Sequence, residues 1–169
     1  MAKRKKKNIG VCLVTILLLA IILTYNPVSI RIMTVGVAVW YRIDPAVFYR
    51  LIRTESSFRS FAISPKSAIG LGQMKESTAL YVNKEHKRGL LFVPVYNLRL
   101  SACYLNYLKN KYNGNWSLVL AAYNWGESNV SRRVKNLTID PHKNYRDTFR
   151  DIPETWNYIG KILPDRKKA

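Results

Sequence analysis

Three short segments of the sequence place polar side chains inside otherwise apolar surroundings. They are Glu55-Ser56-Ser57-Phe58, Gly70-Leu71-Gly72-Gln73-Met74 and Ala121-Ala122-Tyr123-Asn124-Trp125-Gly126. Glu55 follows an apolar run and precedes the glycine-rich segment, a setting in which burial would raise the pKa of its carboxyl group. A carboxyl group that keeps its proton near neutral pH can act as a general acid. The alternative interpretation, a solvated charge at the end of a helix, fits this local pattern equally well.

Other kinds of catalytic site are not indicated. The two histidines, His86 and His142, are far apart in the sequence and have no carboxylate or thiol at ligand spacing, so we expect no metal site and no cofactor. Both lie in polar stretches, which predicts solvated surface side chains. The sequence has no G-x-S-x-G motif and no phosphate-binding loop. Cys103 has no obvious partner base and is interpreted as a small core residue.

A helix must position the glutamate. Asp44 is a good N-cap residue, and Pro45 suits the first helical position. Apolar side chains follow at helical spacing up to Ile52, which puts Glu55 at or just past the C-terminal end of this helix. Residues 56–75 are rich in Ser, Gly and Pro and predict a structured loop with short helical turns.

The C-terminal half predicts several more helices. A helix over residues 97–112 carries one apolar stripe, and Asn115 can cap a short, almost wholly apolar helix over residues 116–123 that should be buried at the centre. No stretch after residue 42 alternates polar and apolar residues for long enough to require a sheet. The domain is therefore predicted to be mainly α, with further helices over residues 127–135 and 154–163.

The first thirty residues are typical of an N-terminal membrane signal. Basic residues fill positions 3–7, and the following 23 residues are uncharged. No A-x-A-like cleavage site follows the apolar run, so we favour an uncleaved anchor over a removed signal peptide. The positive-inside rule then puts the basic end in the cytoplasm and the remaining chain outside. The expected organisation is a cytoplasmic basic arm at 1–8, a membrane anchor or uncleaved signal at 9–30, one domain at 31–165 and a basic tail at 166–169.

Length and charge limit what the domain can be. The chain has 169 residues, enough for one ordinary domain, and its 48% hydrophobic content excludes a disordered tail. It carries 28 Lys and Arg against 10 Asp and Glu, a net charge of +18 that indicates an acidic partner. Nucleic acid is disfavoured because the basic residues are scattered and the domain is expected outside the cytoplasm. Only two cysteines occur, which excludes a disulfide-built mini-fold and a Cys-rich zinc module.

Four motifs, taken in order, resemble those of the lytic transglycosylases of the goose-type-lysozyme-like family. The motifs are Glu55-Ser56, Gly70-Leu71-Gly72-Gln73, Ala122-Tyr123-Asn124-Trp125-Gly126, and Glu154-Thr155 with Tyr158. The resemblance covers about residues 39–163 and implies a lysozyme-like fold with a single catalytic domain. The sequence departs from the family at Gly72, where Met is usual, at Lys75-Glu76, and at Trp125, which replaces a small residue. We expect these departures to alter the lining of the cleft that would bind a glycan strand.

The resemblance also implies an activity. Family members cleave the β-1,4 bond between N-acetylmuramic acid and N-acetylglucosamine in peptidoglycan without adding water, and leave a 1,6-anhydro end. Carried over to this sequence, Glu55 is the catalytic acid and then base. Binding or positioning roles fall on Ser56, Gln73, Met74, Tyr123, Asn124 and Tyr158. The structural alternatives are that Tyr123 and Tyr158 pack in the core and that Gln73 only holds its loop.

Two alternatives to this activity stay open, a lysozyme-type muramidase on the same fold and an inactive glycan-binding scaffold. A muramidase would need a second carboxylate facing Glu55, for which Glu76, Glu127 and Glu154 are candidates. The expected partners are a peptidoglycan strand, the membrane through the N-terminal helix, and a secretion or flagellar machinery that crosses the envelope. The expected location is the bacterial cytoplasmic membrane, crossed once, with the catalytic domain on its periplasmic or cell-wall side.

Overall fold

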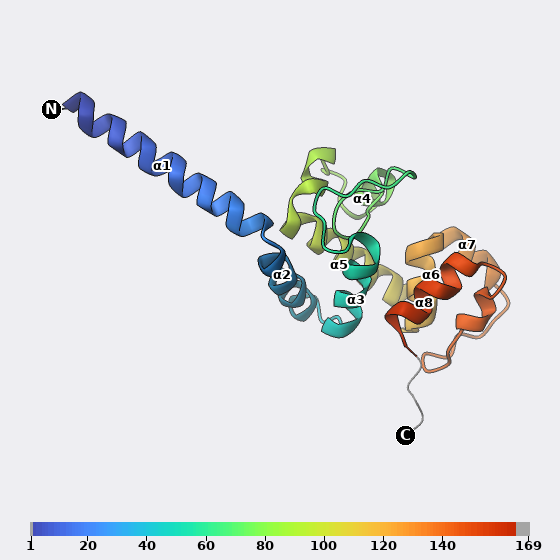
Figure 1. The fold of residues 1–169 in the computed structure, drawn as a ribbon. Helices are drawn as coiled ribbons and strands as arrows, with labels where there is room; N and C mark the ends of the chain where they lie inside the picture. The colour runs from blue at the N-terminus through green and yellow to red at the C-terminus, as the bar shows by residue number, and fades with distance from the viewer. Residues whose placement is uncertain (1, 165–169) are drawn as a thin grey trace, which may run out of the picture.

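The structure is a computed structural model that describes residues 2–164, and it describes side chains from Cys12 onward. The described part is mainly helical, as predicted, and contains isolated β-bridges but no strand. Figure 1 shows α1 projecting away from the body that the other elements form. The elements are α1 (Ala2–Tyr25), α2 (Pro27–Trp40), α3 (Pro45–Ser56), α4 (Glu76–Val82), η1 (Arg88–Phe92), α5 (Pro94–Lys111), α6 (Trp116–Trp125), α7 (Glu127–Arg133), η2 (Arg146–Phe149) and α8 (Pro153–Ile162).

The short helix α6 lies at the centre of the C-terminal half, where it packs against α5, α7 and α8. Its residues from Ser117 to Ala122 are all buried, which confirms the predicted central helix. Asn115 caps it, and the side-chain oxygen of Asn115 accepts a hydrogen bond from the Leu118 N–H group at 3.1 Å. The last turn of α6 therefore carries Tyr123 and Asn124 out of the core on a rigid support.

Helix α3 starts and ends where its sequence predicts. The Asp44 carboxylate accepts hydrogen bonds from the Ala46 and Val47 N–H groups at 2.7 and 3.2 Å, and Pro45 occupies the first helical position. The helix ends at Ser56, and the capping residue Ser57 has a left-handed φ of 53°. Glu55 thus lies in the last turn of a helix whose inner face is buried against α2 and α8.

Several elements differ from the prediction. Helix α5 begins at Pro94 rather than at residue 97. The short elements α4, η1 and η2, each of seven residues or fewer, are not among the predicted helices. Within the predicted loop, Ile69 forms isolated bridges with Ile63 and Met74, which fold the 63–74 segment back on itself.

The N-terminal segment also differs from the expected single anchor over residues 9–30. The helical conformation is interrupted at Asn26. The Asn26 side chain accepts a hydrogen bond from the Val28 N–H group at 2.8 Å and caps the separate helix α2. Ile30 is buried in the core, so the folded body includes residues before the expected boundary at 31. Among the described residues, no single helix has the length and hydropathy of a membrane span; α1 from Cys12 and α2 pass that test only together, bent by 64°. The expected basic tail at 166–169 lies outside the described residues.

Candidate active site

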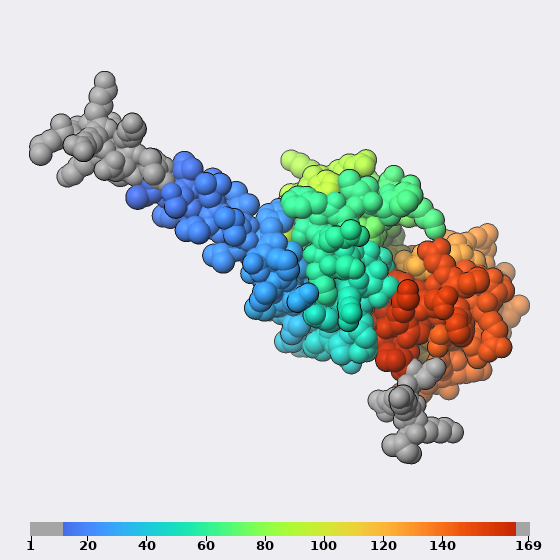
Figure 2. All heavy atoms as spheres, in the orientation of Figure 1, coloured from blue at the N-terminus to red at the C-terminus, as the bar shows by residue number. Residues whose placement is uncertain are grey.

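A cleft of about 480 Å³ separates the 64–78 segment from the ends of α6 and α8. Figure 2 shows this hollow between the green surface of the first segment and the orange and red surface of the C-terminal helices. All four sequence motifs contribute to its lining, through Glu55, Gln73, Asn124 and Glu154. Most of the residues that the sequence singled out are therefore brought to one place.

Glu55 is the residue at the centre of this cleft. Burial raises the pKa of its carboxyl group from 4.5 to about 7, and the negative charge of Glu154 adds to the rise. The Tyr158 hydroxyl opposes this shift, since it donates a hydrogen bond to Glu55 Oε1 at 2.5 Å. The balance leaves a carboxyl group whose pKa lies near neutral pH, which suits a general acid.

Tyr158 reaches Glu55 from α8, 103 residues further along the chain. Its side chain is buried, and its own pKa lies well above 10 because of burial and the neighbouring Glu55 charge. The phenol therefore keeps its proton and acts as a hydrogen-bond donor. Tyr158 is both a core residue and a partner of Glu55, so the two interpretations of its sequence position are compatible.

The glycine-rich segment is held by one buried side chain, that of Asn97 on α5. Asn97 donates to the carbonyl groups of Ile69 and Leu91 at 3.0 and 2.9 Å, and its Oδ1 atom accepts from the Gly72 N–H group at 2.8 Å. Gly70 has a φ of +77°, and a Cβ atom there would lie 2.3 Å from Asn97 Nδ2. The close approach requires glycine at this position. The sequence marked Asn97 only as the start of a helix, although a polar residue in the apolar stripe of α5 was a usable signal.

Gln73 and Met74 line the cleft in different ways. Gln73 has a φ of 47° and donates from its side-chain amide to the carbonyl groups of Gly70 and Ala62 at 2.9 and 3.3 Å. The amide therefore holds its own loop, while its remaining surface faces the cleft. Met74 is almost fully buried, and its sulfur atom lies 3.4 Å from the Tyr123 hydroxyl.

Tyr123 and Asn124 stand side by side in the wall contributed by α6. The Tyr123 hydroxyl donates to the Gly72 carbonyl at 2.7 Å and so ties α6 to the glycine-rich segment. Asn124 Oδ1 accepts a hydrogen bond from the Thr155 hydroxyl at 2.8 Å, which leaves the Asn124 amide group available to a ligand. Thr155 lines the cleft too, and its role in orienting Asn124 was not predicted.

Ser56 is placed differently from the other predicted residues. Its side chain is buried, and its hydroxyl donates back to the Ile52 carbonyl at 3.3 Å within α3. It does not line the cleft. Adjacent residues on a helix point about 100° apart, so the orientation that faces Glu55 toward the cleft turns Ser56 toward the core.

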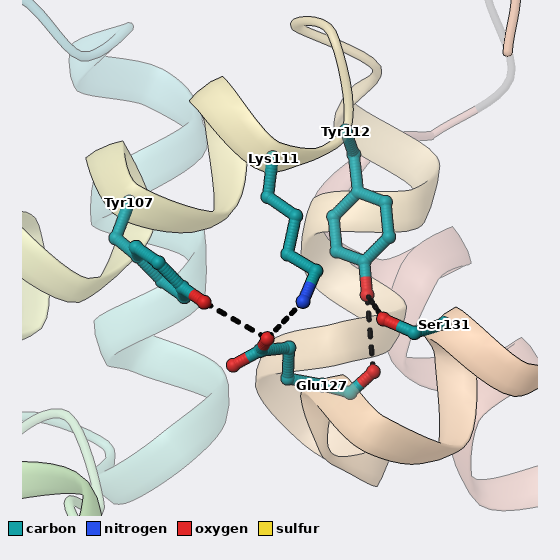
Figure 3. A network of polar contacts seen from close by, with 5 residues as sticks. All are labelled: Tyr107, Lys111, Tyr112, Glu127 and Ser131. Carbon is teal, nitrogen blue, oxygen red and sulfur yellow. Dashed lines mark hydrogen bonds and ion pairs between the residues drawn. The ribbon is translucent and has the colours of Figure 1, made fainter. Parts of the chain in front are cut away.

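Of the three other candidate acids, only Glu154 lines the cleft. It is exposed and forms an ion pair with Lys66 at 3.5 Å. Glu127 is engaged elsewhere, with the Tyr107 hydroxyl and the Lys111 ammonium group, as Figure 3 shows. Glu76 Oε1 lies 3.5 Å from His86 Nε2.

His86 corrects the prediction of a solvated surface histidine. Its side chain is fully buried, and its Nδ1 atom lies 2.9 Å from the Tyr96 hydroxyl. Glu76 and Tyr96 lie ten residues before and after His86, outside the polar stretch that suggested exposure. His142 is exposed, as predicted, and Cys103 is half-buried. In the part of the chain that the structure describes, no three His, Cys, Asp or Glu side chains gather closely enough to hold a metal ion.

Gly72, which stands where the family usually has Met, offers a test of the packing below the cleft. A Cβ atom at this position would lie 2.0 Å from Ser101 Oγ and 2.9 Å from the Tyr123 hydroxyl. We expect Gly72→Ala to displace Tyr123 and to lower the free energy of unfolding by about 1–3 kcal/mol. Gly89→Ala is the matched control, because nothing lies within 4 Å of its added methyl group. Chemical denaturation of both variants measures the effect, and equal stabilities would contradict it.

Comparison with known families gives an independent result. The family model described as the transglycosylase SLT domain matches residues 37–145. Two similar curated proteins are both membrane-bound lytic murein transglycosylases C. The protein from Edwardsiella ictaluri is 33% identical in an alignment of 106 positions that covers 54% of this chain and 30% of that protein. The protein from Haemophilus ducreyi is 26% identical in an alignment of 153 positions that covers 76% of this chain and 42% of that protein.

Solved structures show the same relationship. The lytic transglycosylase Slt from Pseudomonas aeruginosa, in the form of an inactive mutant, matches with a TM-score of 0.69 and 28% identity over 78% of this chain and 22% of that one. A 70-kDa soluble lytic transglycosylase in complex with bulgecin A matches with a TM-score of 0.67 and 22% identity, over 77% of this chain and 22% of that one, and so supports the fold. The chain spans less than half the length of each of these relatives.

Proposed function

Because the chain belongs to the transglycosylase SLT domain family, we propose that it is a peptidoglycan lytic transglycosylase with Glu55 as its catalytic residue. The proposed reaction cleaves the bond from N-acetylmuramic acid to N-acetylglucosamine and leaves a 1,6-anhydro end. The observation that carries the proposal is a carboxyl group with a pKa of about 7 in a cleft, hydrogen bonded to a buried tyrosine.

Glu55 serves first as an acid. Its proton passes to the glycosidic oxygen, the bond from that oxygen to C1 of the muramyl sugar breaks, and the N-acetylglucosamine portion leaves as an alcohol. The C6 hydroxyl of the same muramyl sugar then forms a bond to C1, and its proton returns to the Glu55 carboxylate. The enzyme ends in its starting state and no water is consumed. The internal hydroxyl replaces a bound water molecule at high effective concentration, which supplies much of the rate.

Tyr158 stabilises the carboxylate form that exists between these two proton transfers. A hydrogen bond to a charged acceptor is stronger than one to a neutral acceptor, so the 2.5 Å contact favours loss of the proton. In this proposal Asn124, oriented by Thr155, and the exposed part of Gln73 bind the sugar, which is supported by their place in the lining of the cleft. Tyr123 and Met74, which contact each other, form part of the cleft wall.

Tyr158→Phe tests this role through the pH dependence of the rate. Removal of the hydroxyl takes away the contact that lowers the pKa of Glu55, so that pKa should rise further above 7. The acid form then persists to higher pH, and the alkaline limb of kcat/KM should move upward by about one to two pH units. Tyr112→Phe is the control, since the Tyr112 hydroxyl contacts Ser131 outside the cleft. A Tyr158→Phe profile that overlays the unmodified one would remove Tyr158 from the mechanism.

A lysozyme-type hydrolase is the second candidate, and one observation favours it, namely that Glu154 shares the cleft with Glu55. In our proposal Glu154 only pairs with Lys66 and raises the pKa of Glu55. Glu154→Gln should therefore leave the anhydro product unchanged and alter the rate by no more than about threefold, as for other exposed ion pairs. Chromatography of digested peptidoglycan measures both. A loss of activity as large as that of a Glu55 variant would instead assign Glu154 a catalytic role.

We also propose that α1 holds the protein at a membrane, with the catalytic domain on the outer side. Its apolar side chains from Leu13 to Leu23 are exposed, and five basic residues precede them in the sequence. The curated relatives are described as membrane-bound. A secretion or flagellar machinery as partner stays a prediction.

The proposed activity is tested on purified peptidoglycan sacculi. The full chain should release soluble muropeptides at a rate that falls as the pH rises above about 7, because the acid form of Glu55 is lost. Co-sedimentation with the sacculi, measured in the same samples, separates binding from cleavage. Binding without any release would favour the inactive scaffold and overturn the proposal.

A further inference from the structure

The side of α2 that faces away from the domain is apolar and uncovered. Val28, Ile32, Val35 and Val39 follow one another at helical spacing on this side, and their exposed fractions are 60%, 67%, 41% and 62%. We call these four residues the outer face of α2. Trp40, at the end of the helix, is 82% exposed.

The opposite side of α2 is buried against the domain. Ile30, Thr34, Val37 and Ala38 are all buried there, where α2 packs on α3 and α5. Arg31 is the only charged residue in the helix. A surface helix of a soluble domain normally places polar residues toward water, whereas a helix that is apolar all round is covered on both sides. The outer face of α2 therefore requires an apolar surface against it.

The outer face is continuous with the apolar helix α1. The two helices meet at Asn26 with a bend of 64°, so α2 turns away from the direction of α1, as Figure 1 shows. Tyr25 at the end of α1 stacks on Phe61 with ring centres 5.1 Å apart, and Phe61 lies 6.0 Å from the Phe92 ring. These contacts hold the base of α1 against the domain, and Phe61 itself remains 65% exposed.

Positive charges border the same region. The Arg31 guanidinium group lies 5.5 Å from the centre of the Phe58 ring. Arg59 lines a hollow with Tyr25 and Pro27 at the junction of α1 and α2. At the other end of α2, Arg99 donates a hydrogen bond to the Tyr41 hydroxyl at 3.4 Å. Cations beside an apolar helical face match the headgroups of an anionic lipid surface.

We propose that α2 is an interfacial helix, whose outer face lies in the boundary between headgroups and acyl chains of an anionic membrane. The proposal rests on the membrane association proposed above for α1. Helix α1 enters the bilayer, the bend at Asn26 turns the chain toward the membrane plane, and α2 lies along the surface with the domain on top of it. Full immersion of α2 is excluded, because its inner side packs on α3 and α5.

This placement constrains where the enzyme works. Helix α3, which ends at Glu55, packs directly on α2. Packed helices lie about 8–10 Å apart and have a radius of about 5–6 Å, so the axis of α3 would lie about 15 Å above the lipid boundary. Glu55 would then act on glycan strands close to the membrane.

Environment-sensitive fluorophores attached to single cysteines test the proposal. The full chain carries Cys12→Ser and Cys103→Ser, and one new cysteine is introduced by Val35→Cys on the outer face, Leu17→Cys in α1, or Lys135→Cys on an exposed site after α7. Each labelled protein is reconstituted into vesicles of phosphatidylcholine and phosphatidylglycerol. Quenching by iodide reports contact with water, and quenching by brominated lipids reports contact with acyl chains.

The label at position 35 should show a several-fold lower iodide quenching constant than the label at 135, together with clear quenching by brominated lipids. A label that is lipid-exposed at 17 but water-exposed at 35 overturns the interfacial helix and leaves the anchor standing. Labels that are water-exposed at both positions overturn both proposals. Shielding at 35 that persists in detergent and increases with protein concentration indicates a second copy of the chain on this face and overturns the proposal. Circular dichroism of each labelled protein confirms the fold.

Discussion

Glu55→Gln should lower the rate of glycan cleavage by about 10²- to 10⁴-fold, the contribution of a general acid and base to catalysis. Glutamine keeps the size of the side chain and an oxygen that can accept the Tyr158 hydrogen bond, but it has no proton to donate to the glycosidic oxygen. The rate of muropeptide release measures the loss. The similar structure from Pseudomonas aeruginosa is an inactive mutant in which a glutamate is replaced by glutamine. Cleavage at an undiminished rate would remove Glu55 from the mechanism.

The same substitution should stabilise the fold at neutral and higher pH. The pKa of Glu55 is about 7 in the folded chain against 4.5 as its ordinary value, so the folded state binds the proton more tightly. Stability is therefore lost as the pH rises from about 4.5 to 7, by up to about 3 kcal/mol. Glu55→Gln removes this loss, and its Tm should exceed that of the unmodified chain above pH 7 and match it at acidic pH. A lower Tm at every pH would attribute the lost activity to unfolding.

Asn97→Ala should lower the free energy of unfolding by about 3 kcal/mol or more, because several hydrogen bonds are lost and their buried partners are left without replacement. Asn97 is fully buried and bonds to Ile69, Leu91 and Gly72. Gly72 in turn accepts the hydrogen bond of Tyr123, so the floor of the cleft should loosen as well. Chemical denaturation measures the stability change.

Asn110→Ala is the matched control for this experiment. Asn110 lies on the same helix, α5, but its side chain is exposed. Exposed substitutions of this kind usually change stability by less than about 0.5 kcal/mol. If the two variants lose equal stability, Asn97 has no special role in holding the glycine-rich segment.

The position of Glu55 could be predicted because every determinant is local. Asp44 and Pro45 specify where α3 starts, and the apolar spacing that follows fixes its length and its buried side. The buried central helix α6 could be predicted for the same reason, since Asn115 caps a run that is apolar throughout. The family resemblance added the order of the motifs and thereby the residues that face Glu55 from other elements.

Three features of the fold do not follow from the local sequence pattern. His86 looked solvated because its neighbours in sequence are polar, but Glu76 and Tyr96 cover it in the fold. The family resemblance implies a binding role for Ser56 beside Glu55, although adjacent helical residues point in different directions and the Ser56 hydroxyl bonds within its own helix. The start of helix α2 falls within the expected membrane anchor, because an apolar stretch alone does not distinguish a membrane anchor from a helix packed on a domain.

The most direct test of the central claim is the mass of the glycan ends formed in water enriched in heavy oxygen. A reaction that uses the C6 hydroxyl of the muramyl sugar takes no atom from the solvent. The account predicts 1,6-anhydro ends that are lighter by one water molecule than hydrolysed ends and contain no heavy oxygen. Reducing muramyl ends that carry heavy oxygen in the product of the unmodified chain, and that disappear with Glu55→Gln, would show hydrolysis and contradict the account.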